Sequence, residues 1–247
     1  MNAQGIENLK AITFDFWGTL FTEGENYAYQ VLSLRYEVLL DALSEAGTPA
    51  DEAQVREAYR QAALAYEQAW QAEQMMTPYE RVALIFKLLG ARPDEGLVAL
   101  TARRLEEASL HGSLTPLPGV KESLPKLAQK YRLGVVSDTG ITSGRLLREH
   151  LERHGLLEHF SGFSFSDETL SVKPRREAFM AALDELGVGP QHALHVGDIP
   201  RTDIGGAFNA GYSWAVQYTG HRSLNGGPEP TARVKDHREL FRLLPEA

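Results

Sequence analysis

The sequence predicts an α/β protein, a doubly wound parallel sheet with an all-helical domain inserted after the first strand. From residue 112 to the end, short apolar runs alternate with segments of helical periodicity, as in strand–helix–strand units. Between residues 27 and 111 the apolar residues recur only at helical spacing, and this block is too long for a simple crossover. We therefore expect an α/β core over residues 1–22 and 112–247 and a helical cap domain over residues 23–111.

The expected elements follow in order along the chain. Residues 11–16 (AITFDF) form a short apolar run before Gly18 and Thr19, which predicts a buried strand that ends in a turn. Pro78 and the break at residues 90–93 divide the insert into about four helices. The remaining segments are strands at 132–137, 160–165, 193–196 and 212–217, helices at 142–154, 175–186 and 203–210, and a last helix opened by a capping box of Asp236 and Glu239.

Composition limits the classes of function. The 33 acidic and 25 basic side chains leave a net charge of −8, which argues against nucleic acid and anionic lipid as partners. With no cysteine, the chain has no disulfide, iron–sulfur cluster or thiol nucleophile, so a bound metal needs oxygen or imidazole ligands. No run of about 18 apolar residues and no signal-peptide pattern is present, so we expect a cytoplasmic protein without a membrane partner.

Polar side chains follow the predicted strands at the points where they end. Asp15 follows the first strand, Ser137 and Asp138 the second, and Asp198 the strand at 193–196, with Asp203 five residues later. The carboxyl ends of parallel strands line one crevice, so these side chains should meet there. Converging carboxylates repel one another unless a cation neutralises them, and ligation by oxygen alone suits Mg²⁺. The sequence therefore predicts a magnesium site.

An anion site is predicted beside this metal. Ser137 precedes Thr139 and the start of a helix, so its hydroxyl, nearby backbone N–H groups and the helix dipole can bind an anion. Lys173 opens a later helix and adds a fixed positive charge. Together these residues favour a phosphate next to the metal.

Four motifs in this order resemble those of the haloacid dehalogenase superfamily of hydrolases. Residues 15–20 (DFWGTL) are similar to the first motif, and Val136-Ser137-Asp138 to the second. Lys173-Pro174 is similar to the third, and Gly197-Asp198 with Asp203 to the fourth. Residues 118–120 (PGV) also lie where many members return from an inserted helical cap. The resemblance spans about residues 11–214.

The resemblance implies a mechanism and a set of site residues. Asp15 would be the nucleophile that forms an aspartyl-phosphate, with Lys173 as its catalytic partner. Mg²⁺ would be held by Asp15, the Trp17 backbone carbonyl and Asp198, with Asp203 at or next to the metal. The substrate would be a small phosphorylated metabolite, bound beneath the closing cap by a monomer or homodimer. The implied phosphate-binding residues are Ser137, Asp138, Thr139 and Lys173, although Asp138 alone also fits a turn-forming role.

Trp17 departs from the family pattern. Family phosphatases usually carry there a second aspartate, which protonates the leaving oxygen and then activates water. An indole N–H cannot replace that acid, whose help is typically worth about 10² to 10⁴ in rate. Three interpretations stay open: a phosphatase that manages without this acid, a dehalogenase whose halide leaves unprotonated, and a non-catalytic protein that binds phosphate, metal or a partner.

Other candidate ligands have ordinary interpretations. Asp203 also fits an N-cap of the following helix. His150 and His154 are spaced like zinc ligands, but no third ligand accompanies them, which favours a surface helix. His192 and His195 flank a strand and are assigned no role.

Overall fold

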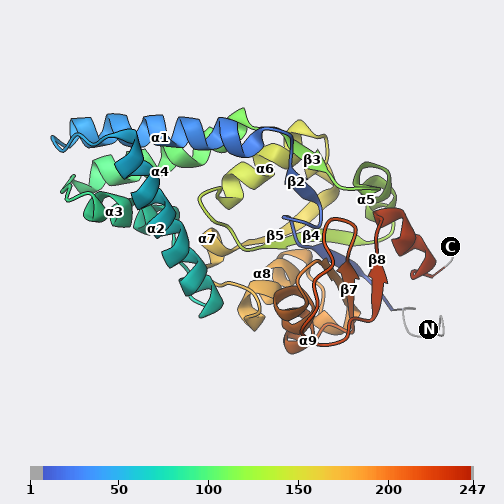
Figure 1. Cartoon of the computed structure of the whole chain (residues 1–247). Coiled ribbons are helices and arrows are strands. Elements are labelled where there is room, and N and C mark those ends of the chain that lie inside the picture. The colour runs from blue at the N-terminus through green and yellow to red at the C-terminus, as the bar shows by residue number, and fades with distance from the viewer. Residues whose placement is uncertain (1–7, 246–247) are drawn as a thin grey trace. The chain divides into compact units, whose positions relative to one another are not determined.

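The computed structural model describes residues 8–245 and has a six-stranded, all-parallel sheet in the order β5-β4-β1-β6-β7-β8 (Figure 1). Its central strand β1 pairs with β4 on one side and β6 on the other, so that Phe14 lies level with both Val135 and Val196. The strands are apolar because central parallel strands are buried on both faces. Their bounds are β1 Ala11–Phe14, β4 Arg132–Ser137, β5 Phe160–Phe165, β6 Ala193–Gly197, β7 Trp214–Tyr218 and β8 Ala232–Val234.

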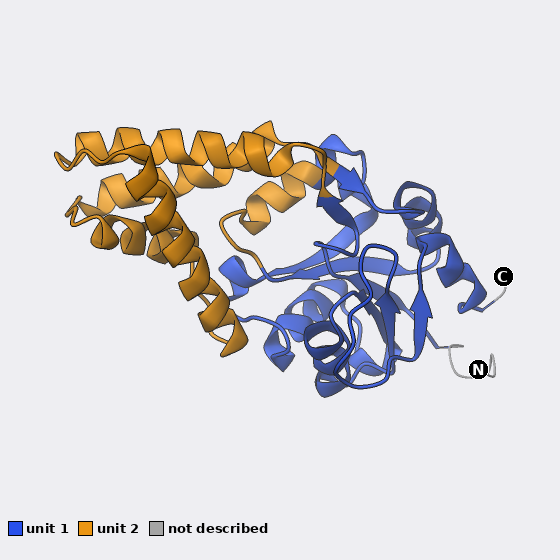
Figure 2. Cartoon of the chain, in the orientation of Figure 1, with its two compact units in different colours: residues 1–22, 115–138, 151–247 blue, residues 23–114, 139–150 orange. Residues whose placement is uncertain are grey.

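Two compact units make up the described chain (Figure 2). Residues 8–22, 115–138 and 151–245 form the α/β unit, and residues 23–114 with 139–150 form the helical unit. The insert expected from the sequence ended at residue 111, whereas the helical unit also takes in the 139–150 segment. This segment is tied to the inserted helices by side-chain hydrogen bonds, among them Arg35 Nη2 to Thr142 Oγ1 at 3.2 Å and Ser143 Oγ to Glu106 at 2.6 Å.

The helical unit has a core of its own. Leu39, Val55, Ile85 and Leu105 are fully buried in one apolar cluster, as the helical spacing of the sequence predicts. Asp51 and Thr77 each open a helix with a capping box. The helices are α1 (Tyr27–Glu45), α2 (Glu52–Gln71), α3 (Pro78–Leu88) and α4 (Glu95–Glu107), followed by a 3-10 helix (Ala108–His111).

The helices of the α/β unit pack on the sheet through small and aromatic side chains. Phe179 of α8 is fully buried, and its ring meets those of His195 and Tyr212 edge-on. The helices are α5 (Val120–Ala128), α7 (Ser166–Thr169), α8 (Arg176–Leu186) and α9 (Gly205–Ala210), and α6 (Gly144–Arg153) joins the two units. Short strands β2 (Phe21–Glu23) and β3 (Leu114–Pro116) pair as a separate two-stranded sheet.

Several expected elements differ from the structure. α5, β8, β2 and β3 were not expected, since they are short and lie beside proline or glycine. The last helix is 3-10 (His237–Arg242), and the expected capping box is wrong because Glu239 accepts from the Lys235 N–H rather than that of Asp236. Asp236 still caps the helix by accepting from Arg238 N at 2.9 Å. None of the helices within residues 8–245 is long and apolar enough to cross a membrane.

Candidate active site

Parallel pairing brings the ends of β1, β4 and β6 to one edge of the sheet. Asp15 lies directly after β1, and its backbone N–H donates to the Val196 carbonyl of β6 at 2.9 Å. Ser137 ends β4, and Asp198 directly follows β6. Sheet register alone therefore places these three positions side by side, as the sequence predicted.

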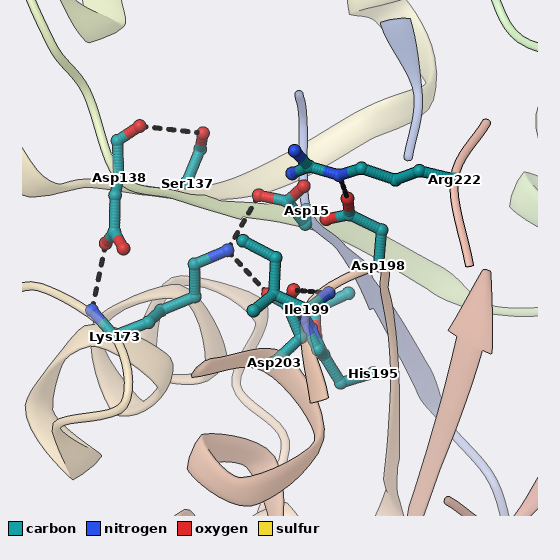
Figure 3. A network of polar contacts seen from close by, with 10 residues as sticks. Asp15, Ser137, Asp138, Lys173, His195, Asp198, Ile199, Asp203 and Arg222 are labelled. Carbon is teal, nitrogen blue, oxygen red and sulfur yellow. Dashed lines mark hydrogen bonds and ion pairs between the residues drawn. The ribbon is translucent and has the colours of Figure 1, made fainter. Parts of the chain in front are cut away.

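Three buried carboxylates converge at this edge. One oxygen from each of Asp15, Asp198 and Asp203 lies within 4.8 Å of the others, and the side chains are almost fully buried. Lys173 Nζ lies 2.6 Å from Asp15 Oδ1 and 2.6 Å from Asp203 Oδ1, joining two of them (Figure 3). Within residues 8–245 this is the only group of carboxylate and imidazole side chains arranged to hold a metal ion. Arg222 contacts the third carboxylate, Asp198, so two cations face three carboxyl groups.

The pKa values express this imbalance of charge. Burial raises the pKa of Asp15 to about 8, and the charges of Asp203 and Asp198 add to the rise although Lys173 opposes it. Burial and Asp203 also raise the pKa of Asp198. Burial would lower the pKa of Lys173, but the adjoining carboxylates raise it well above its usual range. Lys173 therefore remains an ammonium ion, and the excess negative charge favours binding of a cation.

Asp203 occupies the centre of a polar network and does not cap a helix. A single π-helical turn (Pro200–Ile204) precedes α9, and Asp203 Oδ2 accepts from the Ile199 N–H at 2.8 Å. Its Oδ1 also lies 3.4 Å from Nε2 of His195. Burial alone would raise the pKa of Asp203, but Lys173 and His195 lower it. The N-cap interpretation is therefore wrong, and Asp203 is held ionised beside Lys173.

Sequence reasoning missed His195 and Arg222. His195 is fully buried in β6, where its Nδ1 lies 2.9 Å from Thr13 Oγ1, and burial lowers its pKa so that the ring stays neutral. Arg222 follows β7, and its Nε lies 2.5 Å from Asp198 Oδ2. The position of His195 two residues before Gly197 was a usable signal, because alternate residues of a strand share a face. No motif marks Arg222.

The residues after β4 divide between the two units. Asp138 Oδ1 accepts from the Lys173 backbone N–H at 2.9 Å and so anchors the loop that carries Lys173 (Figure 3). The Ser137 hydroxyl is buried and donates to the Asp138 carbonyl at 3.4 Å. Thr139 belongs to the helical unit, where its carbonyl accepts from the Tyr66 hydroxyl at 2.9 Å. This hydrogen bond joins Asp138 to a residue 35 positions later, so it is not the local contact of a turn-forming aspartate.

The turn after β1 lies against Asp198. Gly18 has φ +77°, and a Cβ at this position would lie 2.7 Å from Asp198 Oδ2, so only glycine permits this close approach without strain. The turn brings the Trp17–Gly18 backbone to the carboxylates. The Trp17 ring is half-buried and packs edge-on against Phe16 at 5.1 Å.

His150 and His154 lie outside the carboxylate cluster. His150 is only 2% exposed, so the expectation of a surface helix is wrong at this position. The His154 ring packs against Phe21 with a centroid separation of 5.0 Å. His150 lies in α6 and His154 directly follows its last residue, and neither belongs to a group of side chains arranged to hold a metal ion within residues 8–245.

Comparisons with known proteins match this chain to a family of hydrolases. A family model described as haloacid dehalogenase-like hydrolase matches residues 9–211. The chain is 40% identical over 142 residues to a phosphoserine phosphatase of Thermus thermophilus, covering 57% of this chain and 56% of that protein. It is 30% identical over 170 residues to a glyceraldehyde 3-phosphate phosphatase of Methanopyrus kandleri, covering 66% and 70%. The chain thus spans less than two thirds of the Thermus relative.

Solved structures share the fold. A 2-haloacid dehalogenase from Pseudomonas syringae superposes with a TM-score of 0.70 at 23% identity, over 95% of this chain and 97% of that one. A phosphatase of the same superfamily from Thermococcus onnurineus has a TM-score of 0.64 at 22% identity, with the same coverage of 95% and 97%. Because a dehalogenase and a phosphatase both match, the fold does not choose between their reactions.

Proposed function

Because this chain belongs to the haloacid dehalogenase-like hydrolase family, we propose that it is a magnesium-dependent phosphatase. Its substrate would be a small phosphorylated metabolite in the cytoplasm, and Asp15 would be the nucleophile. The observation that carries the proposal is the placement of Lys173 Nζ 2.6 Å from Asp15 inside a buried cluster of three carboxylates. The two curated relatives described above, both named as phosphatases, give independent support.

The residues present fit a hard divalent cation. Asp198 Oδ1 is buried and accepts no hydrogen bond within the described chain, so one ligand oxygen is free. Carboxylate oxygens in this number suit Mg²⁺. Asp15, Asp198 and the Trp17 carbonyl would hold the ion, with Asp203 beside them. When bound, Mg²⁺ would neutralise charge on the phosphoryl oxygens and on the carboxylates.

The remaining chemistry belongs to the chain's own side chains. An Asp15 oxygen attacks phosphorus, the ester P–O bond breaks, and the alcohol oxygen leaves with the bonding pair. Water then attacks the aspartyl-phosphate, releasing inorganic phosphate and restoring the carboxylate. Lys173 stays protonated throughout and stabilises negative charge on the transferred group, while the Ser137 hydroxyl donates to a phosphoryl oxygen. Asp203 keeps Lys173 in place through its 2.6 Å contact.

Neither Trp17 nor Lys173 is a suitable proton donor for the leaving oxygen. Trp17 cannot supply one, and the raised pKa of Lys173 makes its ammonium a poor acid. The proposed enzyme should therefore favour esters whose leaving group is stable as an anion, or substrates that carry their own acid. An aryl phosphate meets the first condition.

Trp17 also favours a second candidate, the dehalogenation of a 2-haloacid. Halide leaves without a proton, so this reaction does not need the missing aspartate. The carboxylates of Asp198 and Asp203 argue against dehalogenation, because they would repel a carboxylate substrate and have no role in that reaction. We therefore rank dehalogenation below phosphate transfer, and a non-catalytic phosphate-binding protein remains the third candidate.

A hydrolysis screen with and without Mg²⁺ tests the proposal. The panel contains p-nitrophenyl phosphate, O-phosphoserine, glyceraldehyde 3-phosphate and, for halide release, chloroacetate. We expect metal-dependent phosphate release that Asp15→Asn abolishes, while the exposed Asp184→Asn in α8 retains wild-type activity. An active Asp15→Asn would disprove the nucleophile. Halide release without phosphate release would select dehalogenation, and neither activity would select the non-catalytic candidate.

Trp17→Asp tests the missing acid. Restoring a carboxyl group should raise kcat for an alkyl phosphate by up to about 10² to 10⁴, the usual contribution of general acid–base help. Hydrolysis of p-nitrophenyl phosphate should change far less, because p-nitrophenolate leaves unprotonated. An equal change for both esters would show that proton supply does not limit the reaction.

A further inference from the structure

Arg222 is the second cation that contacts the buried carboxylate cluster of the α/β unit. Its Nε donates to Asp198 Oδ2 at 2.5 Å, whereas Lys173 contacts Asp15 and Asp203. In Figure 3 the two cations reach the carboxylates from opposite sides. The side chain of Lys173 is 4% exposed and that of Arg222 is 47% exposed. Arg222 is therefore the cation that is open to solvent.

Only one edge of the Arg222 guanidinium is used. The planar group has one edge formed by Nε with an Nη group and another formed by the two Nη groups, and each edge can bind two oxygens. Nε donates to Asp198, and neither Nη group forms a hydrogen bond within residues 8–245. The edge formed by Nη1 and Nη2 is therefore available to an oxyanion.

The loop that carries Arg222 is fixed to the sheet on both sides of this residue. The Thr219 backbone N–H donates to the Val234 carbonyl of β8 at 2.8 Å. Gln217 of β7 is buried, and its Nε2 donates to the Leu224 carbonyl at 2.8 Å. The Arg222 side chain therefore extends from a held backbone, as a side chain that positions a ligand must.

Asp198 joins Arg222 to the candidate metal site. Its Oδ2 accepts from Arg222, while its Oδ1 is buried and accepts no hydrogen bond within the described chain. This carboxylate can thus contact a divalent cation through Oδ1 and hold Arg222 through Oδ2. Two positive charges at one carboxylate repel each other, and an anion bound to both would relieve that repulsion.

The charges of the site favour a further cation once a phosphate ester is bound. The three carboxylates carry up to three negative charges, and a phosphate ester adds about two. Lys173 supplies one positive charge and a divalent cation two, which leaves an excess of about two negative charges. Arg222 reduces that excess to about one. A phosphate dianion is therefore bound more favourably with this guanidinium in place.

We propose that Arg222 binds the phosphoryl group of the substrate through its Nη1–Nη2 edge. This edge matches two phosphoryl oxygens, and hydrogen bonds between charged groups are about twice as strong as those between neutral groups. The inference rests on the proposed function, because the group bound is the one that Asp15 attacks. Arg222 is thus a catalytic residue that stabilises charge on these oxygens during transfer, and it stays protonated throughout.

Binding of inorganic phosphate tests this contact without catalysis. Inorganic phosphate is titrated by calorimetry into the full-length protein with saturating Mg²⁺. We expect Arg222→Gln to weaken phosphate binding about tenfold to hundredfold, because hydrogen bonds between charged groups are lost. Arg222→Lys should keep part of the affinity, since an ammonium has the charge but not the two-pronged edge. Arg242→Gln, at an exposed position in the last 3-10 helix, should bind phosphate like the wild type.

Binding of Mg²⁺ without phosphate separates the loss of one contact from damage to the whole cluster. Arg222→Gln removes a positive charge next to Asp198, so its affinity for Mg²⁺ alone should not fall. The proposal is overturned if the wild type does not bind phosphate, if Arg222→Gln binds it equally tightly, or if this variant loses affinity for both ions. Full phosphate affinity in Arg222→Lys would also overturn it, because the lysine has no two-pronged edge.

Hydrolysis of p-nitrophenyl phosphate separates this inference from the proposed function. We expect kcat/KM to fall about tenfold to hundredfold in Arg222→Gln and to stay at the wild-type value in Arg242→Gln. Phosphate binding that depends on Arg222, without hydrolysis of any ester, would support the phosphate contact and reject the phosphatase. Hydrolysis that Asp15→Asn abolishes but Arg222→Gln leaves unchanged would support the phosphatase and reject the role of Arg222.

Discussion

Lys173→Met isolates the electrostatic role of the buried ammonium. The methionine side chain has a similar length but no charge, so both 2.6 Å contacts, to Asp15 and Asp203, are lost. The three side chains are 4%, 7% and 0% exposed, so water cannot replace the missing charge. Breaking a buried ion pair from one side typically costs about 3–5 kcal/mol. This is a large part of the about 5–15 kcal/mol that stabilises a folded protein.

Urea unfolding at pH 7 without metal measures how far Lys173→Met lowers the free energy of unfolding. The matched control is Lys126→Met, at an exposed position in α5. Added Mg²⁺ should restore stability to the Lys173→Met variant more than to the wild type, because the ion supplies the missing positive charge. The deficit should also shrink as the pH falls, since protonated carboxyl groups need no counter-charge. A loss below about 1 kcal/mol, the value typical of surface pairs, would refute the electrostatic reasoning.

Two further predictions concern Arg222 and His237. Arg222→Gln removes the cation 2.5 Å from Asp198, which competes for a metal-ligand oxygen. The arginine side chain is 47% exposed, so its ion pair with Asp198 is weak. The variant should therefore bind Mg²⁺ up to about fivefold more tightly, as measured by calorimetry. Weaker Mg²⁺ binding would show that Arg222 does not compete with the metal for Asp198. Burial lowers the pKa of His237 from 6.5 to about 4, so the unfolded chain binds this proton more tightly. The free energy of unfolding should therefore fall by about 3 kcal/mol between pH 6.5 and pH 4 through this residue. His237→Gln keeps a donor for the Thr19 carbonyl but cannot gain a proton. In urea titrations at several pH values, the free energy of unfolding of this variant should depend less on pH than that of the wild type. An identical pH dependence would contradict the assignment to His237.

Much of the candidate site could be predicted because the topology of the sheet brings its residues together. Asp15, Ser137 and Asp198 each follow a strand, and in a parallel sheet all strand ends of one direction share an edge. Lys173 lies in a loop and was found through its motif, while the structure adds its two carboxylate contacts. His195 was assigned no role, because its position in the strand indicates the face of the sheet but not its contacts with Thr13 and Asp203.

Contacts between segments that are distant in the chain could not be predicted from the sequence. Arg222 reaches Asp198 from a loop after β7 with no regular pattern, and Arg81 meets Gly140 only after α3 has packed in the helical unit. The same limit applies to the segment at residues 139–150, which the sequence assigned to the α/β core although its hydrogen bonds join it to the inserted helices.

The sequence by itself determined the fold class, the family resemblance and the positions of the carboxylates, because hydrophobic period and strand-end polarity are local properties. Only the tertiary structure decided which charges are paired. Within residues 8–245 it gave Lys173 two carboxylates and left Asp198 Oδ1 and Arg81 Nε without a hydrogen-bond partner. The physical reason is that the energy of a buried charge depends on side chains within a few ångströms, and their identity is fixed by packing between segments far apart in the chain.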